Sequence, residues 1–263
     1  MKGVDEMESL IKIETDLPLG LYHNLNERLQ YAYMRLLEGI SHMASEIRLQ
    51  LNDIQEILPL YYALCCDYPE TKLVWDYKGS TYSSAYMDKN GREIILYARY
   101  HGNYECIKKK LQNIERETER IIEICMYGDK ITDDDIVRRL CAYLARVYHY
   151  TEDTNNRIYP EYAYTLECLV RGDGVCAGFA GALTYILRKL QIPVMTVSGE
   201  ANGRYFGGHA WNIIQRADGT YWHIDLTWNL GCTLEEQKYF ELDDGAMRAR
   251  DHYWNGQEYP MCG

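Results

Sequence analysis

A glycine-rich turn that leads directly into an amphipathic helix constrains the fold of this 263-residue chain more than any other segment. The turn is Arg171-Gly172-Asp173-Gly174, and the helix begins near Cys176 and ends at Gln191-Ile192-Pro193, because proline cannot continue it. Its apolar residues recur with the helical period and share one face: Phe179, Leu183, Ile186, Leu187 and Leu190. Gly178 and Gly181 are poor helix formers, which indicates that the helix packs closely on a sheet.

After this helix the apolar pattern changes to the period of two that is typical of β-strands. Residues 194–198 are predicted as one strand, and a glycine-containing loop through Gly208 follows it. Residues 209–215 and 220–228 are predicted as two further strands joined by a turn at Arg216-Ala217-Asp218-Gly219. A helix followed by hairpin-connected strands predicts an α+β fold, with the helix on an antiparallel sheet.

The first part of the chain mixes helical and β patterns. A helix is predicted over about 24 to 45 and a short strand over 47–51, and Asn52 is expected to cap a helix that runs through Tyr61. The period of two then predicts three strands, with a turn at Lys89-Asn90-Gly91 between the last two. These strands are Lys72 to Trp75, Tyr82 to Tyr86 and Ile94 to Tyr100.

Two more helices lead up to the glycine-rich turn. A long charged helix is predicted over about 103 to 127, and Thr132 is expected to cap the next one. No Pro- or Ser-rich linker marks a boundary. We expect a helical and β N-terminal region at residues 1–129, which can serve as an accessory part, and a catalytic core at residues 130–263.

The charge of the chain argues against two classes of partner. Its formal net charge is −11 and its isoelectric point is near 5.2, whereas nucleic acids and anionic membranes attract a basic surface. No apolar run approaches the ~20 residues that a membrane helix needs. We therefore expect no nucleic-acid and no membrane partner.

The start of the chain gives the expected location. Residues 1–10 are acidic and lack the apolar core of a secretory signal, so the default expectation is a cytoplasmic protein. A secreted protein whose signal peptide had been removed would have the same features.

The cysteines do not form the pattern of a disulfide framework or a metal site. There are nine of them, irregularly spaced, and no CxxC pair occurs. The three adjacent acids Asp133, Asp134 and Asp135 suit the positive end of a helix, and no loop of oxygen ligands follows them. We expect no metal and no cofactor.

One cysteine, Cys176, has the surroundings of a nucleophile. Unpaired N–H groups at a helix start favour a thiolate and can stabilise an oxyanion. His209 and Asp225 lie on the two strands that follow, in Gly208-His209-Ala210-Trp211 and His223-Ile224-Asp225-Leu226. A thiol, a histidine and a carboxylate in this order are the components of a nucleophile with an oriented base.

The length of the hairpin loop decides whether the histidine and the carboxylate share a face. A two-residue loop pairs Asp225 with Asn212 and places His209 on the opposite face. A three-residue loop, Ala217-Asp218-Gly219, pairs residue 216 with 220, 211 with 225 and 209 with 227. His209 and Asp225 are then diagonal neighbours on one face, and Gly219 suits the left-handed position that ends such a loop.

Other residues near the site have alternative roles. His223 lies on the face of Asp225 and is a rival base, although we prefer His209 because glycines precede it, and we expect His223 to be structural. Trp211 and Trp228 fit a core role and a substrate-groove role equally well. The remaining histidines show no pattern with cysteine or carboxylate and are given no chemistry: His23, His42, His101, His149 and His252.

Three segments together resemble a known family. They are Gly174-Val175-Cys176-Ala177-Gly178-Phe179-Ala180, Gly208-His209-Ala210-Trp211-Asn212 and His223-Ile224-Asp225-Leu226-Thr227-Trp228. Over about residues 130 to 230 the chain resembles the transglutaminase-like superfamily, with its papain-like Cys-His-Asp core, and in particular its bacterial branch. The resemblance implies Cys176 as nucleophile, His209 as base and Asp225 as the residue that orients the base.

The resemblance also has departures that bear on the reaction. Ala177 stands where animal transglutaminases have Trp, Asn229 follows D-x-T-W where bacterial members often have Asp, and no calcium loop is evident. Cross-linking of proteins is therefore a weaker expectation than hydrolysis.

The resemblance implies an enzyme that acts on a protein or peptide. We expect an amide or peptide hydrolase, or an acyl transferase, that works through a Cys176 thioester, with the N–H of Cys176 and Tyr164 as oxyanion donors. The alternatives are a transglutaminase-type cross-linking enzyme and a non-catalytic interaction module on the same fold. Arylamine-type acyl transfer would use the same triad but would need a cofactor pocket that the sequence does not indicate.

Overall fold

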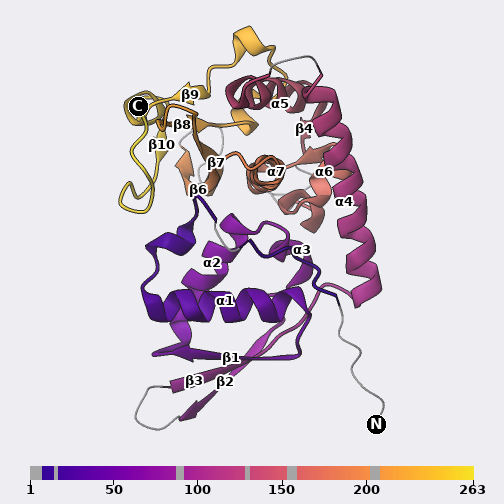
Figure 1. The fold of residues 1–263 in the computed structure, drawn as a ribbon, viewed down its shortest axis with the longest axis vertical. Helices are drawn as coiled ribbons and strands as arrows, with labels where there is room; N and C mark the ends of the chain where they lie inside the picture. The colour runs from indigo at the N-terminus through magenta and orange to yellow at the C-terminus, as the bar shows by residue number, and fades with distance from the viewer. Residues whose placement is uncertain (1–7, 15–16, 87–91, 128–130, 153–158, 202–207) are drawn as a thin grey trace. The chain divides into compact units, whose positions relative to one another are not determined.

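The structure is a computed structural model that describes residues 8–14, 17–86, 92–127, 131–152, 159–201 and 208–263 (Figure 1). The chain divides into two compact units within one long helix, α4 (Tyr104–Cys125). The first unit comprises residues 1–17 and 21–111, and the second comprises 18–20 and 112–263. The turn predicted at 89–91, most of the loop before Gly208 and the first seven residues lie outside the described residues.

The first unit packs helices on a three-stranded antiparallel sheet of order β1-β3-β2. Its strands are β1 (Glu46–Leu51), β2 (Thr81–Tyr86) and β3 (Arg92–Tyr97), close to the predicted segments. Its helices are α1 (Glu27–Ser41), α2 (Ile57–Asp67) and α3 (Thr71–Val74), with the 3-10 turns η1 (Leu21–Asn24) and η2 (Ile54–Glu56).

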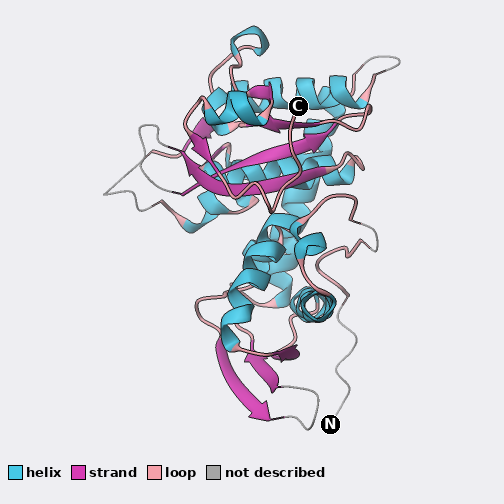
Figure 2. Ribbon diagram, turned by 90° about the vertical axis from the view of Figure 1, so that its left-hand side faces the viewer, coloured by secondary structure: helices cyan, strands magenta, loops and turns pink. Residues whose placement is uncertain are grey.

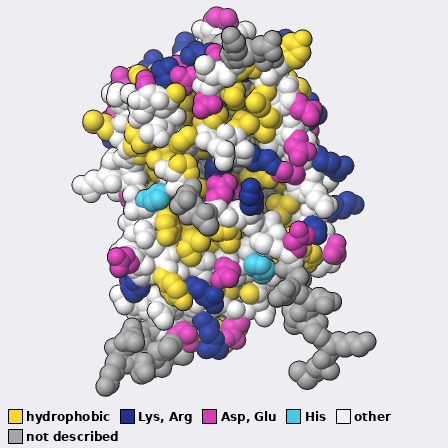
Figure 3. Space-filling view, in the orientation of Figure 1, with side chains coloured by type: hydrophobic (Ala, Val, Ile, Leu, Met, Phe, Trp, Pro, Cys, Tyr) yellow, Lys and Arg dark blue, Asp and Glu magenta, His cyan; other side chains and the backbone are white. Residues whose placement is uncertain are grey.

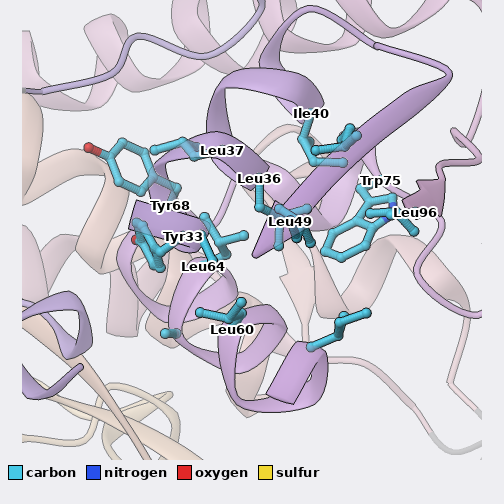
Figure 4. Packing of buried hydrophobic residues seen from close by; sticks show 14 of the residues in the cluster. Tyr33, Leu36, Leu37, Ile40, Leu49, Leu60, Leu64, Tyr68, Trp75 and Leu96 are labelled. Atoms are coloured by element: carbon cyan, nitrogen blue, oxygen red, sulfur yellow. The ribbon is translucent and has the colours of Figure 1, made fainter. Parts of the chain in front are cut away.

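The core of this unit lies between α1, α2 and β1. Side chains alternate along β1, so that Ile47, Leu49 and Leu51 are buried and their neighbours are exposed. Figure 4 shows Leu36 and Leu37 of α1 and Leu60 and Leu64 of α2 packed around Leu49. The apolar face of α1 predicted from the sequence is the face that is buried.

Two predictions for this unit are wrong. Asp53, and not Asn52, caps the turn after β1: its side chain accepts a hydrogen bond from the N–H of Gln55. Residues Lys72 to Trp75 form no strand, because Thr71–Val74 is a helical turn in which the N–H of Trp75 donates to the carbonyl of Thr71. A buried run of four residues satisfies either period, so the pattern could not distinguish the two.

The second unit contains a five-stranded antiparallel sheet of order β10-β6-β7-β8-β9 (Figure 2). The strands are β6 (Val194–Ala201), β7 (Gly208–Gln215), β8 (Tyr221–Ile224), β9 (Phe240–Leu242) and β10 (His252–Tyr253). The helices are α5 (Asp133–Val147), α6 (Glu167–Arg171), α7 (Cys176–Lys189) and α8 (Asp244–Arg248), and part of α4 belongs to the unit. A small parallel pair, β4 (His149–Tyr150) and β5 (Asp173–Gly174), leads into α7.

The predicted start of α5 is confirmed. The Thr132 side chain accepts a hydrogen bond from the N–H of Asp135, and the Asp135 carboxylate accepts one from the N–H of Thr132. This reciprocal capping box accounts for Asp135, and Asp134 pairs with Arg216 at 2.9 Å.

Helix α7 is the central element of the second unit, and it packs on the sheet as predicted. Viewed end-on in Figure 1, it lies between β6 and β7 on one side and α4 and α6 on the other. Its apolar face is buried, including Phe179, Leu183 and Ile186. On the opposite side the Tyr185 hydroxyl donates to the Glu115 carboxylate of α4, and Lys189 pairs with the same carboxylate. The α+β fold predicted for this part of the chain is therefore correct.

Glycines set the path of the chain into α7. Gly172 has a φ of 83°, in the left-handed region, and ends α6.

Gly178 was expected to allow close packing of α7 on the sheet, but it faces a different neighbour. A Cβ on Gly178 would lie 2.2 Å from the carbonyl oxygen of Ala163, so this glycine admits the 3-10 turn η3 (Glu161–Tyr164) and not the sheet.

Gly178→Ala tests that contact. Alanine is the better helix former, yet we expect the variant to lose about 1–3 kcal/mol of stability, because the Cβ must displace the η3 backbone. Chemical denaturation followed by tryptophan fluorescence measures this change. Gly102→Ala is the matched control, since its Cβ would make only ordinary contacts of 3.6 Å or more. A Gly178→Ala variant as stable as the parent chain would show that the close approach to Ala163 is wrong.

The charges on the surface are mixed. On the face drawn in Figure 3, Lys and Arg side chains are interspersed with Asp and Glu. Among the helices of the described residues, none combines the length and the apolar character needed to cross a bilayer.

Candidate active site

Cys176 is the first residue of α7 and is partly exposed. Val175 precedes it in extended conformation, and its N–H donates to the carbonyl of Ala163, which ties the start of α7 to η3. The Val175 carbonyl accepts hydrogen bonds from the N–H groups of Gly178 and Phe179. Helix geometry leaves the N–H groups of Cys176 and Ala177 with no intrahelical acceptor, so they can bind an anion beside the sulfur.

His209 reaches the site from β7 through the hairpin register that the sequence favoured. Asn212 pairs with Ile224 and Gln215 with Tyr221, and the N–H of Arg216 donates to the carbonyl of Thr220. This is the register of the three-residue loop, and Gly219 has the expected left-handed φ of 86°. His209 and Asp225 therefore approach each other.

Asp225 does not lie inside a strand, and this part of the prediction is wrong. Strand β8 ends at Ile224, Leu226 is helical, and a 3-10 turn, η4 (Thr227–Asn229), follows. The chain turns because the Asp225 carboxylate accepts a hydrogen bond of 3.1 Å from the N–H of Trp228. Such a side-chain bond to the backbone two or three residues later competes with a strand ladder.

The imidazole and the carboxylate form a short buried pair. Nε2 of His209 lies 2.6 Å from Oδ2 of Asp225, whose side chain is fully buried. Burial opposes a charge on His209, but the Asp225 carboxylate and a hydrogen bond with the Cys176 thiol outweigh it and raise the pKa of His209 to about 10. Since Nε2 is bound to Asp225, Nδ1 is the nitrogen left for the thiol. Burial likewise opposes ionisation of Asp225, yet His209 and then His252 lower its pKa to about 2.

These shifts predict how stability depends on pH. The raised pKa of His209 stabilises the folded chain fully below about pH 6.5, and this contribution disappears as the pH rises towards 10. The lowered pKa of Asp225 contributes above about pH 4, and this contribution is lost as the pH falls towards 2. The stability that His209→Gln removes should therefore be largest between about pH 4 and 6.5.

Denaturation of the parent chain and of His209→Gln at a series of pH values measures this difference in stability. Tryptophan fluorescence suits it, because four of the five tryptophans, Trp211, Trp222, Trp228 and Trp254, lie in the second unit. A stability difference that stays constant from about pH 4 to pH 10 would contradict the charged pair.

His252 is the residue of this site that the sequence analysis missed. It is fully buried on β10, and its Nε2 lies 3.0 Å from the same Asp225 oxygen that binds His209. Strand β10 comes late in the chain and pairs with β6, with His252 opposite Ala201. No motif surrounds the residue, so only the tertiary pairing brings it to Asp225.

His223, the rival base, is buried, and both of its ring nitrogens have side-chain partners. The Trp211 indole N–H donates to its Nδ1 at 2.9 Å, and its Nε2 lies 3.0 Å from Asp244 Oδ1. An acceptor at Nδ1 makes the ring neutral with a proton on Nε2. Burial, the largest influence, lowers the pKa of His223 to about 4.

The three residues assigned to substrate contacts lie in different surroundings. Trp211 is 1% exposed and belongs to the core. Trp228 is partly exposed, and its ring centroid lies 5.7 Å from that of His209 and 4.6 Å from that of His252. Tyr164 is 40% exposed at the end of η3, and the pKa of its hydroxyl is raised, first by desolvation and then by the neighbouring Cys176.

A buried polar contact fixes the thiol helix against the histidine strand. The Asn212 amide of β7 donates to the Ala180 carbonyl at 3.0 Å and to the Thr184 hydroxyl at 2.9 Å, both on α7. Thr184 in turn lies 2.8 Å from the hydroxyl of Thr196 on β6. Because buried polar groups lose their partners if the helix slides, this network holds Cys176 in register with His209.

An open groove of about 1000 Å³ lies in the second unit, lined on one side by β4, η3 and β5. Tyr150, Tyr159 and Tyr162 contribute aromatic rings to it, and Leu230 and Gly231 lie along it just after η4. Tyr159 also contacts Tyr164, with ring centroids 6.3 Å apart. The groove thus adjoins the residue that neighbours Cys176.

Two groups in the described part of the chain have donor atoms close enough to hold a metal ion. They are His209, Asp225 and His252, and His223, Asp244 and Cys262, with donor atoms within 4.8 Å of one another. In both groups the carboxylate and histidine nitrogens are joined by hydrogen bonds of 2.6–3.0 Å. A metal would have to displace the protons of these bonds, so hydrogen bonding accounts for both groups.

A comparison with known protein families agrees with the resemblance seen in the sequence. A family model described as the transglutaminase-like superfamily matches residues 126–226, a range that contains Cys176, His209 and Asp225. The superfamily suggested by the three sequence segments is thus confirmed.

Solved structures show distant likenesses. One is described as a TGase: it is 14% identical with a TM-score of 0.39, and the match covers 69% of this chain and half of that one. A candidate cysteine protease from Cytophaga hutchinsonii is 11% identical, with a TM-score of 0.35 and coverage of 58% and 63%. The periplasmic domain of TgpA from Pseudomonas aeruginosa is 15% identical, with a TM-score of 0.33 and coverage of 70% and 72%. A comparison with curated proteins found no match.

Proposed function

We propose that this chain is a cysteine-dependent enzyme that cleaves an amide bond through a thioester on Cys176, with His209 as base and Asp225 as the residue that orients it. The observation that carries the proposal is the buried His209–Asp225 pair, which leaves the other ring nitrogen for a partly exposed thiol at a helix start. The catalytic core is residues 130–263, and residues 1–129 are accessory.

The reaction begins with transfer of a proton from Cys176 to His209. Nδ1 of His209 takes the proton of the Cys176 thiol, and the resulting imidazolium is stabilised by the Asp225 carboxylate. The raised pKa of His209 favours this proton position at neutral pH. The thiolate then attacks the carbonyl carbon, and the carbonyl electron pair moves to the oxygen.

Donors at the start of α7 stabilise the oxyanion. The N–H of Cys176 points along the positive end of the helix, and the Tyr164 hydroxyl is the second donor. Both belong to the contact between α7 and η3 that Gly178 makes possible.

Collapse of the intermediate breaks the carbon–nitrogen bond. His209 Nδ1 gives its proton to the leaving amine, and the acyl group remains on sulfur as a thioester. Water then attacks the thioester while His209 takes a proton from it, the carbon–sulfur bond breaks, and the acid leaves. No metal or cofactor takes part in this scheme.

The substrate is a peptide or protein segment. We assign it to the groove beside β4, η3 and β5, where three tyrosines can pack against an extended chain. Hydrolysis is preferred over amine transfer because the described residues include no marked site for an acceptor amine. All nine cysteines are thiols and none forms a disulfide, which favours a reducing compartment such as the cytoplasm.

A library of peptide amides tests the proposal. The protein is incubated with the library, the products are identified by mass spectrometry, and Cys176→Ala serves as the blank. We expect acid products that depend on Cys176, and an acyl adduct on Cys176 at short times. Added primary amines distinguish the reactions, since a transferase would convert the acid products to new amides. If neither product depends on Cys176, the proposal is wrong.

A further inference from the structure

His252 gives the Asp225 carboxylate a second histidine. His209 Nε2 and His252 Nε2 lie 2.6 and 3.0 Å from the same oxygen, Oδ2, while Trp228 donates its N–H to the other oxygen. A triad requires only the first of these contacts. Because His252 and Asp225 are both fully buried, their contact is not a surface ion pair that salt would screen.

Both ring nitrogens of His252 face acceptors. Nδ1 lies 2.8 Å from the backbone carbonyl of Arg250, which can only accept, so Nδ1 carries a hydrogen. Nε2 faces the Asp225 carboxylate, which is an acceptor in its ionised form. A histidine that donates through both nitrogens is an imidazolium cation.

His223, the neighbouring buried histidine, does not have acceptors at both ring nitrogens. His223 is equally buried, but the Trp211 indole N–H donates to its Nδ1, which makes that ring neutral. The two histidines therefore differ in charge because one Nδ1 meets a carbonyl and the other meets an N–H donor.

The surroundings of His252 suit a cation. Its ring centroid lies 4.6 Å from that of Trp228, 5.1 Å from that of Trp211 and 5.6 Å from that of Tyr239, and aromatic rings attract cations. The titratable or charged groups around it are His209 on β7, His223 on β8, Asp225 after β8, Tyr239 before β9, and Arg250 and Asp251 beside it in the chain. Of these, Asp225 is the acid that a hydrogen bond of 3.0 Å joins to the ring.

We propose that His252 is a positioning residue that donates hydrogen bonds through both ring nitrogens and offsets the charge of Asp225, and thereby sets the pH at which the Cys176–His209 pair ionises. The inference rests on the proposed function, because it assigns Asp225 the task of stabilising the His209 imidazolium. A carboxylate alone would stabilise that imidazolium fully. With His252 beside it, the carboxylate belongs to a neutral pair. His209 then holds its proton less strongly, and the Cys176 thiol next to a protonated His209 ionises at lower pH.

The pH dependence of Cys176 alkylation tests this effect. Iodoacetamide is the probe, and the rate at Cys176 is followed by mass spectrometry for the intact chain and for His252→Gln, whose amide can still donate to Asp225 but carries no charge. We expect the rising limb of the pH–rate profile to move up by about one pH unit, which is a tenfold slower reaction on that limb, because the variant removes a cation that favours loss of the thiol proton. His42→Gln, an exposed histidine in the first unit, is the control and should leave the profile in place.

Superimposable profiles, or a limb that moves to lower pH, would overturn the inference. If Cys176 of the intact chain reacts no faster than an ordinary exposed thiol, the proposed function fails instead, so the two failures are distinguishable.

A second measurement does not need a folded variant or a reactive thiol. In the intact chain labelled with ¹⁵N-histidine, NMR reports whether each ring nitrogen carries a proton. Near neutral pH we expect two buried rings with both nitrogens protonated, His209 and His252, and a third, His223, with a single proton. In His252→Gln the doubly protonated signals of residue 252 should vanish, and those of His209 should remain. A His252 ring with one bare nitrogen would overturn the inference.

Discussion

Cys176→Ala is expected to abolish acyl transfer, with a loss on the order of 10⁴-fold or more in turnover, because no other group in the scheme can form the thioester. The fold should survive, since the side chain is partly exposed at a helix start and alanine is a good helix former. Turnover on a cleaved peptide amide and circular dichroism give the two measurements.

Cys232→Ala is the matched control for this variant. Cys232 is the other cysteine of intermediate exposure, and it lies in the same unit just after η4. Its replacement should leave turnover unchanged. If the two variants lose turnover equally, or if Cys176→Ala is fully active, Cys176 is not the nucleophile.

Asp225→Ala is expected to lower turnover by about 10³-fold, less than the loss of the nucleophile. The variant removes the acceptor for His209 and His252 together and leaves the imidazole free to rotate. It should also destabilise the second unit by about 3–5 kcal/mol, because a buried ion pair loses one partner.

Asp225→Asn separates orientation from charge. Its carbonyl oxygen can still accept from His209, so it should recover part of the turnover that Asp225→Ala loses. If Asp225→Ala is as active as the parent chain, His209 needs no orienting residue and the proposed triad is wrong. If Asp225→Asn is no more active than Asp225→Ala, orientation is not what the carboxylate contributes.

Much of the fold around the candidate site could be predicted from interactions between residues that are close in the sequence. Gly219 suits a three-residue loop, one of the two registers weighed from the sequence, and the structure has the register of that loop. The Thr132 capping box and the glycines before Cys176 likewise act within a few residues. Such signals can be recognised in a single sequence because their partners are near in the chain.

The predictions that failed concern features that no local sequence pattern reveals. His252 meets Asp225 across 27 residues, through a strand of only two residues that has no periodic pattern. Strand β8 ends early because Asp225 binds the backbone of Trp228, a side-chain choice that alternation does not reveal. The segment Lys72 to Trp75 is too short for its period to distinguish strand from helix.

Alkylation of the nine cysteines by iodoacetamide, compared across pH, tests the central claim most directly. The rate at each residue is read by mass spectrometry, and Cys106, which is exposed on α4, is the internal reference. If Cys176 is a nucleophile paired with His209, it should react at least about tenfold faster than Cys106 near pH 6, and His209→Gln should remove most of that advantage. A Cys176 that reacts no faster than Cys106 at any pH would contradict the account.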